Sequence, residues 1–390
     1  MKGHRHSFAF ACCFPGPDWQ IQSTNFAREG NTLKQGFCLL RAYAQRSVSL
    51  PIHGMTVEEL HAALRDGRLK PGEAAKLTAE QLTARNASGN TPLHSAAKYG
   101  LLDQLSAQLL TRENLLIKNV SGYTPLHHAA LGGHLNQLPR SAIATDVLLT
   151  RSNLGYTVLH VAAGHGHLNQ IPPALITAEI VQTKTDLGNT LLHEAAENGT
   201  LDRFPAAFIT APLLAQANAS GETVFHVAAL NGNLGQIPLA LLTPEAMLAK
   251  TGSGDTVLHA AALAGRLEQI PAALLTHAHL TIASKSGFTV IHAAAETGQL
   301  NKIPRAELTR DLLLTRTDHG DTPLHAAAYE GHLDQIPAEL LTAETLNVRN
   351  YDSVTPLRTA LGRGFAEQIP AALRPKPEGA FTRLLRRCGF

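Results

Sequence analysis

Thr124-Pro125-Leu126-His127-His128-Ala129-Ala130 is a short segment that closes at Gly133 and recurs, with small changes, at a fixed step of 33 residues. No insertion or deletion interrupts this spacing. A fixed period of this size predicts a stack of small units, each in contact only with its neighbours, rather than one closed core. The threonine that opens each segment is Thr91, Thr124, Thr157, Thr190, Thr223, Thr256, Thr289, Thr322 or Thr355.

The composition of the 390 residues excludes several classes of protein. The formal net charge is only +2, and no basic stripe runs through the repeats, so we expect no nucleic-acid partner. The sequence has no apolar run of about 18 residues, so we expect no membrane span. The four cysteines, Cys12, Cys13, Cys38 and Cys388, lie outside the repeats, and the fold should need no disulfide. A cytoplasmic location is the natural expectation, with a secreted or host-directed role left open.

Local signals predict where each unit turns and where its first helix lies. A glycine stands two residues before the threonine, as in Gly122, and suits a turn with positive φ. The threonine is a typical N-cap, and four units place a proline directly after it. A second glycine, such as Gly133, follows the Ala-Ala pair and predicts the end of the helix.

The pattern Gly-x-Thr-Pro-Leu-His-x-Ala-Ala-x-x-Gly-His-Leu at this period resembles the ankyrin repeat family, over roughly residues 55–374. The resemblance implies an all-α helical repeat solenoid, a curved stack of helix–turn–helix units with short projecting β-turn fingers. It also implies that the chain binds other proteins. In that family the histidine of the motif ties neighbouring turns together by hydrogen bonds. This implies a structural role for His94, His127, His160, His193, His226, His259, His292 and His325.

The second half of each unit departs from the family pattern. Where the family has one continuous helix, this chain has Leu-x-Gln-Ile-Pro, as in residues 168–172, and most units repeat the proline. A proline deep inside a helix costs about 3 kcal/mol. We therefore expect the helix to begin at the proline, and a threonine further on to cap another turn. The prediction for one unit is two short turns, at about residues 337–341 and 343–346.

The repeat register divides the chain into four parts. Residues 1–54 share nothing with the repeats and are expected to be a disordered lead-in or a segment ahead of the true start at Met55. Residues 55–87 keep a degraded copy of the motif and are predicted to form an N-terminal capping repeat. Nine repeats then fill residues 88–374, and residues 375–390 form a basic tail.

No residue pattern points to chemistry on a ligand. A catalytic histidine would not be copied eight times at equal spacing, and neighbouring copies should stand roughly 10 Å apart, too far to share a metal ion. The pairs His165–His167 and His277–His279 lack further ligands. We expect no enzyme activity, no metal and no cofactor. If the repeated histidines are buried and neutral, their pKa should lie below about 6.5 and acid should destabilise the fold.

Recognition should use the positions at which the units differ. Five such residues fall in three consecutive units and are candidate partner-binding residues, because tyrosine is a favoured interface anchor: Tyr99, Tyr123, His128, Tyr156 and His165. The later units are acidic at Glu197, Glu222, Asp255, Glu296 and Asp321, which would suit a partner with an apolar patch and a basic flank. The sequence leaves two alternatives open, a structural or self-associating spacer and a metal-dependent enzyme. We expect a monomeric scaffold that binds another protein.

Overall fold

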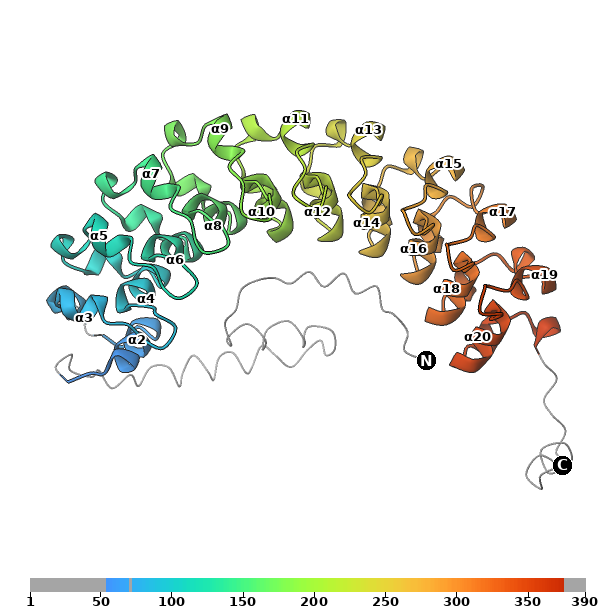
Figure 1. Cartoon of the computed structure of the whole chain (residues 1–390), viewed down its shortest axis with the longest axis horizontal. Coiled ribbons are helices and arrows are strands. Elements are labelled where there is room, and N and C mark those ends of the chain that lie inside the picture. The colour runs from blue at the N-terminus through green and yellow to red at the C-terminus, as the bar shows by residue number, and fades with distance from the viewer. Residues whose placement is uncertain (1–53, 70–71, 375–390) are drawn as a thin grey trace, which may run out of the picture. The chain divides into compact units, whose positions relative to one another are not determined.

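The computed structural model describes residues 54–69 and 72–374 of the chain. The predictions for residues 1–53 and for residues 375–390 concern segments outside these ranges. Within the described part, helical units stand side by side in a curved row. The first helix of each unit lies along the inner side and the shorter helices lie along the outer side (Figure 1). The predicted all-α stack is confirmed: the described residues form no strand, only isolated β-bridges such as Arg151 with Thr157.

The first helices begin after the predicted threonines and end one or two residues before the predicted glycines. Thr124 is the N-cap of its helix, and Gly133 ends it with a φ of 75°. The Ala-Ala pair of each full unit is buried, as at Ala129 and Ala130, and lets neighbouring helices approach closely. The first helices are α2 (Val57–Arg65), α4 (Pro92–Lys98), α6 (Pro125–Gly132), α8 (Val158–Gly164), α10 (Leu191–Asn198), α12 (Val224–Leu230), α14 (Val257–Leu263), α16 (Val290–Glu296), α18 (Pro323–Glu330) and α20 (Pro356–Arg363).

Tight turns project between the units as fingers, and backbone hydrogen bonds link their tips. The Val120 backbone N–H donates to the Ser88 carbonyl at 3.1 Å. The equivalent bond recurs between successive fingers, and the last of these bonds joins the Tyr351 N–H to the His319 carbonyl. The glycine before each threonine has the expected positive φ. Ser353 takes its place in the last unit at a φ of 58°, which shows that the turn itself demands this conformation.

The second half of each unit breaks into short turns, as the prolines predict. In one unit η15 (Leu333–Gln335), η16 (Ala338–Leu340) and α19 (Ala343–Leu346) replace a continuous helix. The predicted start was wrong by one residue: Pro337 has an extended ψ of 131° and caps the turn rather than opening it. The other short α-helices are α3 (Ala79–Thr83), α5 (Arg112–Leu115), α7 (Thr145–Leu148), α9 (Ala178–Val181), α11 (Ala211–Leu214), α13 (Pro244–Met247), α15 (His277–Leu280) and α17 (Arg310–Leu313).

Single 3-10 turns fill the rest of the outer layer. The leucine that opens the first of these turns in most units is buried, as at Leu135 and Leu168, whereas the second turn lies at the surface, as Leu239 in η11 shows. The 3-10 turns are η1 (Ala74–Lys76), η2 (Leu102–Gln104), η3 (Ala107–Leu109), η4 (Leu135–Gln137), η5 (Arg140–Ala142), η6 (Leu168–Gln170), η7 (Pro173–Leu175), η8 (Leu201–Arg203), η9 (Ala206–Phe208), η10 (Leu234–Gln236), η11 (Leu239–Leu241), η12 (Leu267–Gln269), η13 (Ala272–Leu274), η14 (Leu300–Lys302), η17 (Ala366–Gln368) and η18 (Ala371–Leu373).

In five units the glutamine of Leu-x-Gln-Ile-Pro, or of its close variants, joins the unit to the one before it. Gln137 Nε2 donates to the Gly100 carbonyl at 3.0 Å, and its Oε1 accepts from the Leu102 N–H at 3.2 Å. These are backbone groups at the end of one helix and the start of the next turn, which otherwise lack partners. Gln170, Gln236, Gln269 and Gln368 form the same pair of bonds. Where the family has a long second helix, the Leu-x-Gln-Ile-Pro motif therefore places a glutamine side chain that forms two hydrogen bonds to the preceding unit.

Candidate functional site

The repeated histidines connect each first helix to the next finger. His127 Nδ1 accepts from the backbone N–H of Thr124 at 3.1 Å, and its Nε2 donates to the Tyr156 carbonyl at 3.1 Å. Each of the eight forms this pair of bonds, with Nε2 to carbonyl distances of 3.1–3.3 Å. Both ring nitrogens are thus used by the neutral imidazole. His61, one period earlier, bonds the Asn90 carbonyl in the same way, a member that sequence analysis left out.

Burial lowers the pKa of all eight histidines. It brings the pKa to about 4 for His94, His127, His160, His193, His226 and His292, and lowers it for His259 and His325. The geometry gives a second reason, because a proton on Nδ1 would face the threonine backbone N–H. The neutral form is therefore strongly favoured in the folded chain.

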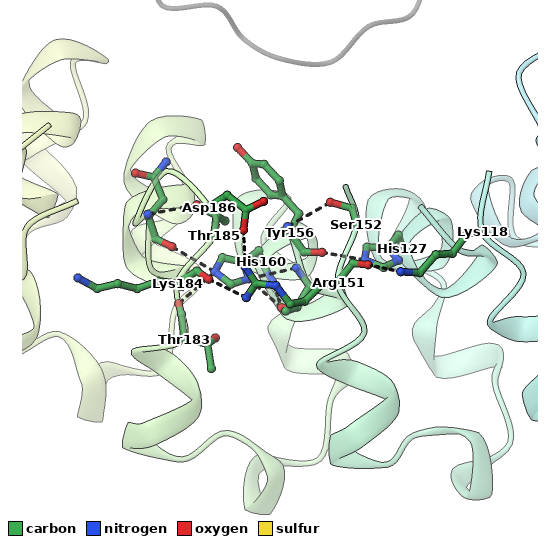
Figure 2. Close-up of polar contacts among 12 residues, drawn as sticks. Lys118, His127, Arg151, Ser152, Tyr156, His160, Thr183, Lys184, Thr185 and Asp186 are labelled. Carbon is green, nitrogen blue, oxygen red and sulfur yellow. Dashed lines mark hydrogen bonds and ion pairs between the residues drawn. The ribbon is translucent and has the colours of Figure 1, made fainter. Parts of the chain in front are cut away.

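A line of basic side chains runs beside the histidines at the base of the fingers. Lys118 Nζ donates to the Arg151 carbonyl at 2.8 Å, and Arg151 Nη1 donates to the Lys184 carbonyl at 2.9 Å (Figure 2). Arg85 starts the line and Lys184 continues it to the Ala217 carbonyl. These exposed cations bond to carbonyl oxygens and, at Arg151, also to the Asp186 carboxylate. They fix the spacing of the fingers, and Arg316 donates in the same way to the Arg349 carbonyl further along the row.

The structure places the five candidate residues on the fingers and inner helices of consecutive units. Tyr99 ends α4 and is 38% exposed. His128 lies in α6, with its ring centroid 5.1 Å from that of His94. His165 caps α8, and its Nδ1 donates to the Val161 carbonyl at 3.0 Å. Tyr123 and Tyr156 lie on the fingers, and the Tyr156 ring points away from the basic line (Figure 2).

Two of these tyrosines are less exposed than the sequence suggested. Tyr123 and Tyr156 are half-buried, and their rings pack edge-on against His127 and His160, with centroids 5.1 and 6.2 Å apart. Burial, aided by the charge of Glu194, raises the pKa of the Tyr123 hydroxyl to about 12. The regular histidine beneath each of these two fingers provides an aromatic neighbour, which explains why the rings are only half-exposed.

Three consecutive fingers, two of which carry Tyr123 and Tyr156, have exposed apolar tips that sequence analysis did not single out. Val120, Leu154 and Leu187 are 70%, 39% and 54% exposed. The units on either side have serine at the position of Leu154 and Leu187, namely Ser121 and Ser220. The change from serine to leucine on a solvent-exposed turn is the feature of the sequence that could have identified these tips. Exposed apolar side chains that recur on neighbouring fingers can together form a contact site for another protein.

Comparison with known families agrees with this geometry. A model for three copies of the ankyrin repeat matches residues 60–138, and a model for a single ankyrin repeat matches residues 319–351. The chain is an ankyrin repeat protein. No curated protein matches it. The ankyrin units between the two matched segments repeat the same histidine and finger bonds, from His160 to His292. Ankyrin repeats are generally protein–protein interaction modules.

The described part of the ankyrin stack also bears on the expectations about a membrane span and a metal site. None of the helices in the described ranges is long and apolar enough to cross a bilayer. Within the same ranges, no three His, Cys, Asp or Glu side chains gather as a metal site would require. The absence of a cofactor, of catalysis and of oligomers stays a prediction.

Two of the acidic residues that sequence analysis named, Glu222 and Asp321, accept hydrogen bonds from asparagine side chains. Asn218 Nδ2 donates to Glu222 Oε2 at 2.9 Å, and Asn350 Nδ2 donates to Asp321 Oδ1 at 2.7 Å. A further acid, Glu194, which sequence analysis overlooked, is only 5% exposed. Burial, reinforced by the nearby charge of Glu197, raises its pKa to about 8. It is therefore mostly protonated at pH 7.

Proposed function

We propose that this ankyrin stack is a scaffold that binds another protein, without catalysis, through the inner side and finger tips of its N-terminal units. The surface comprises the apolar tips Val120, Leu154 and Leu187 together with Tyr99, Tyr123, His128, Tyr156 and His165. We call it the recognition surface. The observation that carries the proposal is that exposed apolar tips lie on three consecutive fingers, two of which also carry a tyrosine, Tyr123 or Tyr156. Apolar anchors bordered by polar groups are the usual composition of a protein interface.

The charges around the recognition surface support a choice of partner. Acids such as Glu222 and Asp255 lie on the fingers that follow the recognition surface, while the basic position at the base of the fingers recurs at Arg316. At the level of the fingers, a partner segment that lies along the row would therefore meet apolar side chains first and acids after them. Complementary charge of this kind orients a partner and raises its rate of association. We therefore expect the bound segment to have an apolar centre and a basic end toward the middle units.

A photo-crosslinking amino acid placed at Leu187 tests the proposal. Leu239 provides the matched control, because it is an equally apolar residue, 73% exposed, on the outer turn η11. We expect a discrete crosslinked protein from position 187 and none from position 239, identified by mass spectrometry. Tyr156→Ala should remove the adduct at a temperature at which circular dichroism shows the variant to be folded, since loss of this half-buried ring also lowers stability. Equal adducts from the two positions, or an adduct that survives Tyr156→Ala, would show that this surface binds nothing specific and would favour a spacer.

A further inference from the structure

The junction between residues 253–285 and residues 286–318 lacks the glutamine bonds that join other units. Lys302 stands at the position of Gln137, whose side chain bonds a carbonyl and an N–H group of the preceding unit. A lysine side chain carries donors but no acceptor, so it cannot form this pair of bonds. The carbonyl of Gly265 and the N–H of Leu267 therefore do not receive the contacts that their counterparts have.

The packing at this junction is also the loosest between the full units of the described chain. A Cβ atom added to the glycine that follows each first helix would lie 2.6–3.1 Å from a side chain of the next unit at the seven other junctions, from Gly100 to Gly331. At Gly265 the nearest atom, Nε2 of Gln299, would lie 3.8 Å away. Oε1 of Gln299 is buried and has no hydrogen-bond partner among the described residues. A gap and an unsatisfied polar atom both destabilise a contact.

The outer turn of the unit formed by residues 286–318 has lost an apolar contact as well. Glu307 stands where the other full units have an apolar residue, namely Leu109, Ala142, Leu175, Phe208, Leu241, Leu274, Leu340 and Leu373. The Glu307 carboxylate instead accepts from the His277 N–H of the preceding unit at 2.6 Å, in an exposed hydrogen bond. Water and salt weaken an exposed charged contact of this kind.

The other junction without a glutamine is closed by different side chains. Arg203 takes the place of the glutamine, and its Cδ atom would lie 2.6 Å from a Cβ atom on Gly166 of the preceding unit. The outer turn keeps an apolar residue, Phe208, whose ring packs edge-on against Phe204 with the centroids 6.4 Å apart. Loss of the glutamine alone therefore does not loosen a junction. At Lys302 it coincides with a gap and with a charged outer turn.

The fingers and first helices still connect the two units at the loose junction. Thr297 Oγ1 donates to the Ala262 carbonyl at 2.7 Å, and the Lys285 N–H donates to the Ser253 carbonyl at 2.9 Å. Ion pairs also join residues 286–318 to the unit that follows: Arg305 with Glu339 and Arg310 with Glu344. Separation should therefore occur on the side of the outer turns, and residues 286–374 should move together.

We propose that this junction is a hinge, at which the outer turns separate while the fingers and first helices stay in contact. Residues 286–374 then rotate as one block against residues 55–285. The first helices line the inner side of the curved row, so opening of the outer side tightens the curve (Figure 1). A row that bends at one junction fits partners of different width, which a uniform stack does not. The hinge does not depend on the recognition surface, which lies in the N-terminal units.

Distances between spin labels on the outer turns test the hinge in the full chain, after its four natural cysteines are replaced by serine. Labels at the exposed residues Gly235 and Asn301 span the hinge. Labels at the exposed residues Asp202 and Glu268 are the matched control, because the two junctions between them have the glutamine bonds. Each pair is two repeat steps apart, on the order of 20 Å, a distance that double electron–electron resonance measures.

We expect the distances between Gly235 and Asn301 to be more broadly distributed than those of the control pair, and to extend about 3 Å or more beyond them. The double substitution Lys302→Gln with Glu307→Leu restores the residues usual in the other units. It should narrow this distribution to the width of the control pair and leave the control pair unchanged, in a variant that circular dichroism shows to be folded. Equal widths for the two pairs in the wild type would overturn the hinge. So would a Gly235–Asn301 distribution that the double substitution leaves as broad as before.

Discussion

Lowering the pH from 7.5 to 5 is expected to reduce the melting temperature of the chain by more than about 10 °C. The folded pKa of six repeated histidines is about 4, below the value of 6.5 for the unfolded chain. The unfolded state therefore takes up protons first. The stabilising contribution is complete above pH 6.5 and is lost as the pH falls from there toward 4.

The size of this effect follows from the number of copies. At pH 5 each such histidine would lower the free energy of unfolding by about 2 kcal/mol relative to its value at pH 7.5. Six of them together reach the order of the net stability of an ordinary domain, about 5–15 kcal/mol. Glu194 acts in the opposite direction, because its raised pKa makes the fold lose stability as the pH rises, but it is a single residue.

A pair of substitutions tests whether the repeated histidines cause the loss of stability at low pH. His127→Gln keeps a side chain that can bond the Thr124 N–H, as glutamine does in a capping box, but it cannot take up a proton. This variant should be less stable at pH 7.5 and lose less stability on acidification. His277→Gln, at an exposed position of α15, should change neither value. A melting temperature that stays constant from pH 7.5 to pH 5 would refute the account of the histidines.

Gly132→Ala is expected to destabilise the chain by about 1–3 kcal/mol, although alanine is the better helix former. A Cβ atom at Gly132 would lie 2.1 Å from the backbone oxygen of Lys98, on the preceding first helix. A backbone atom cannot rotate away as a side chain can, so α6 and α4 must separate. Chemical denaturation with fluorescence or circular dichroism measures the loss.

Gly362→Ala is the matched control for this prediction. Gly362 also lies near the end of a first helix, α20, and a Cβ atom there meets nothing within 4 Å. This change should be neutral or stabilise by up to about 1 kcal/mol, the difference in helix propensity. Equal effects of the two substitutions would mean that the close approach of neighbouring first helices does not hold the stack together.

Most of the fold was predictable because it depends on local rules. The capping threonine and the positive φ of Gly122 each follow from a few neighbouring residues. The break before Pro337 follows from the missing N–H of proline, although the turn starts one residue later than expected. Gln137 could not be assigned in this way, because its two partners lie in the preceding unit and become neighbours only in the stack.

The candidate site was less predictable. Val120 and Leu187 depart from the polar residues usual on a turn, so inspection of the differences between units could have found them. The half-buried state of Tyr123 depends on His127 beneath it, which a sequence does not reveal. Glu194 was overlooked because an acid on an amphipathic helix normally faces water, whereas here packing of successive units buries it.

Removal of one whole unit tests most directly whether the chain is a stack of interchangeable repeats. Deleting residues 253–285 removes 33 residues and joins Gly252 to Ser286, which keeps the repeat register. We expect this variant to remain monomeric and helical and to unfold cooperatively at a somewhat lower temperature, as measured by circular dichroism, because each unit contacts only its neighbours. An aggregated or unfolded product without a cooperative transition would contradict the account, since only a closed core should fail to tolerate the loss of one period.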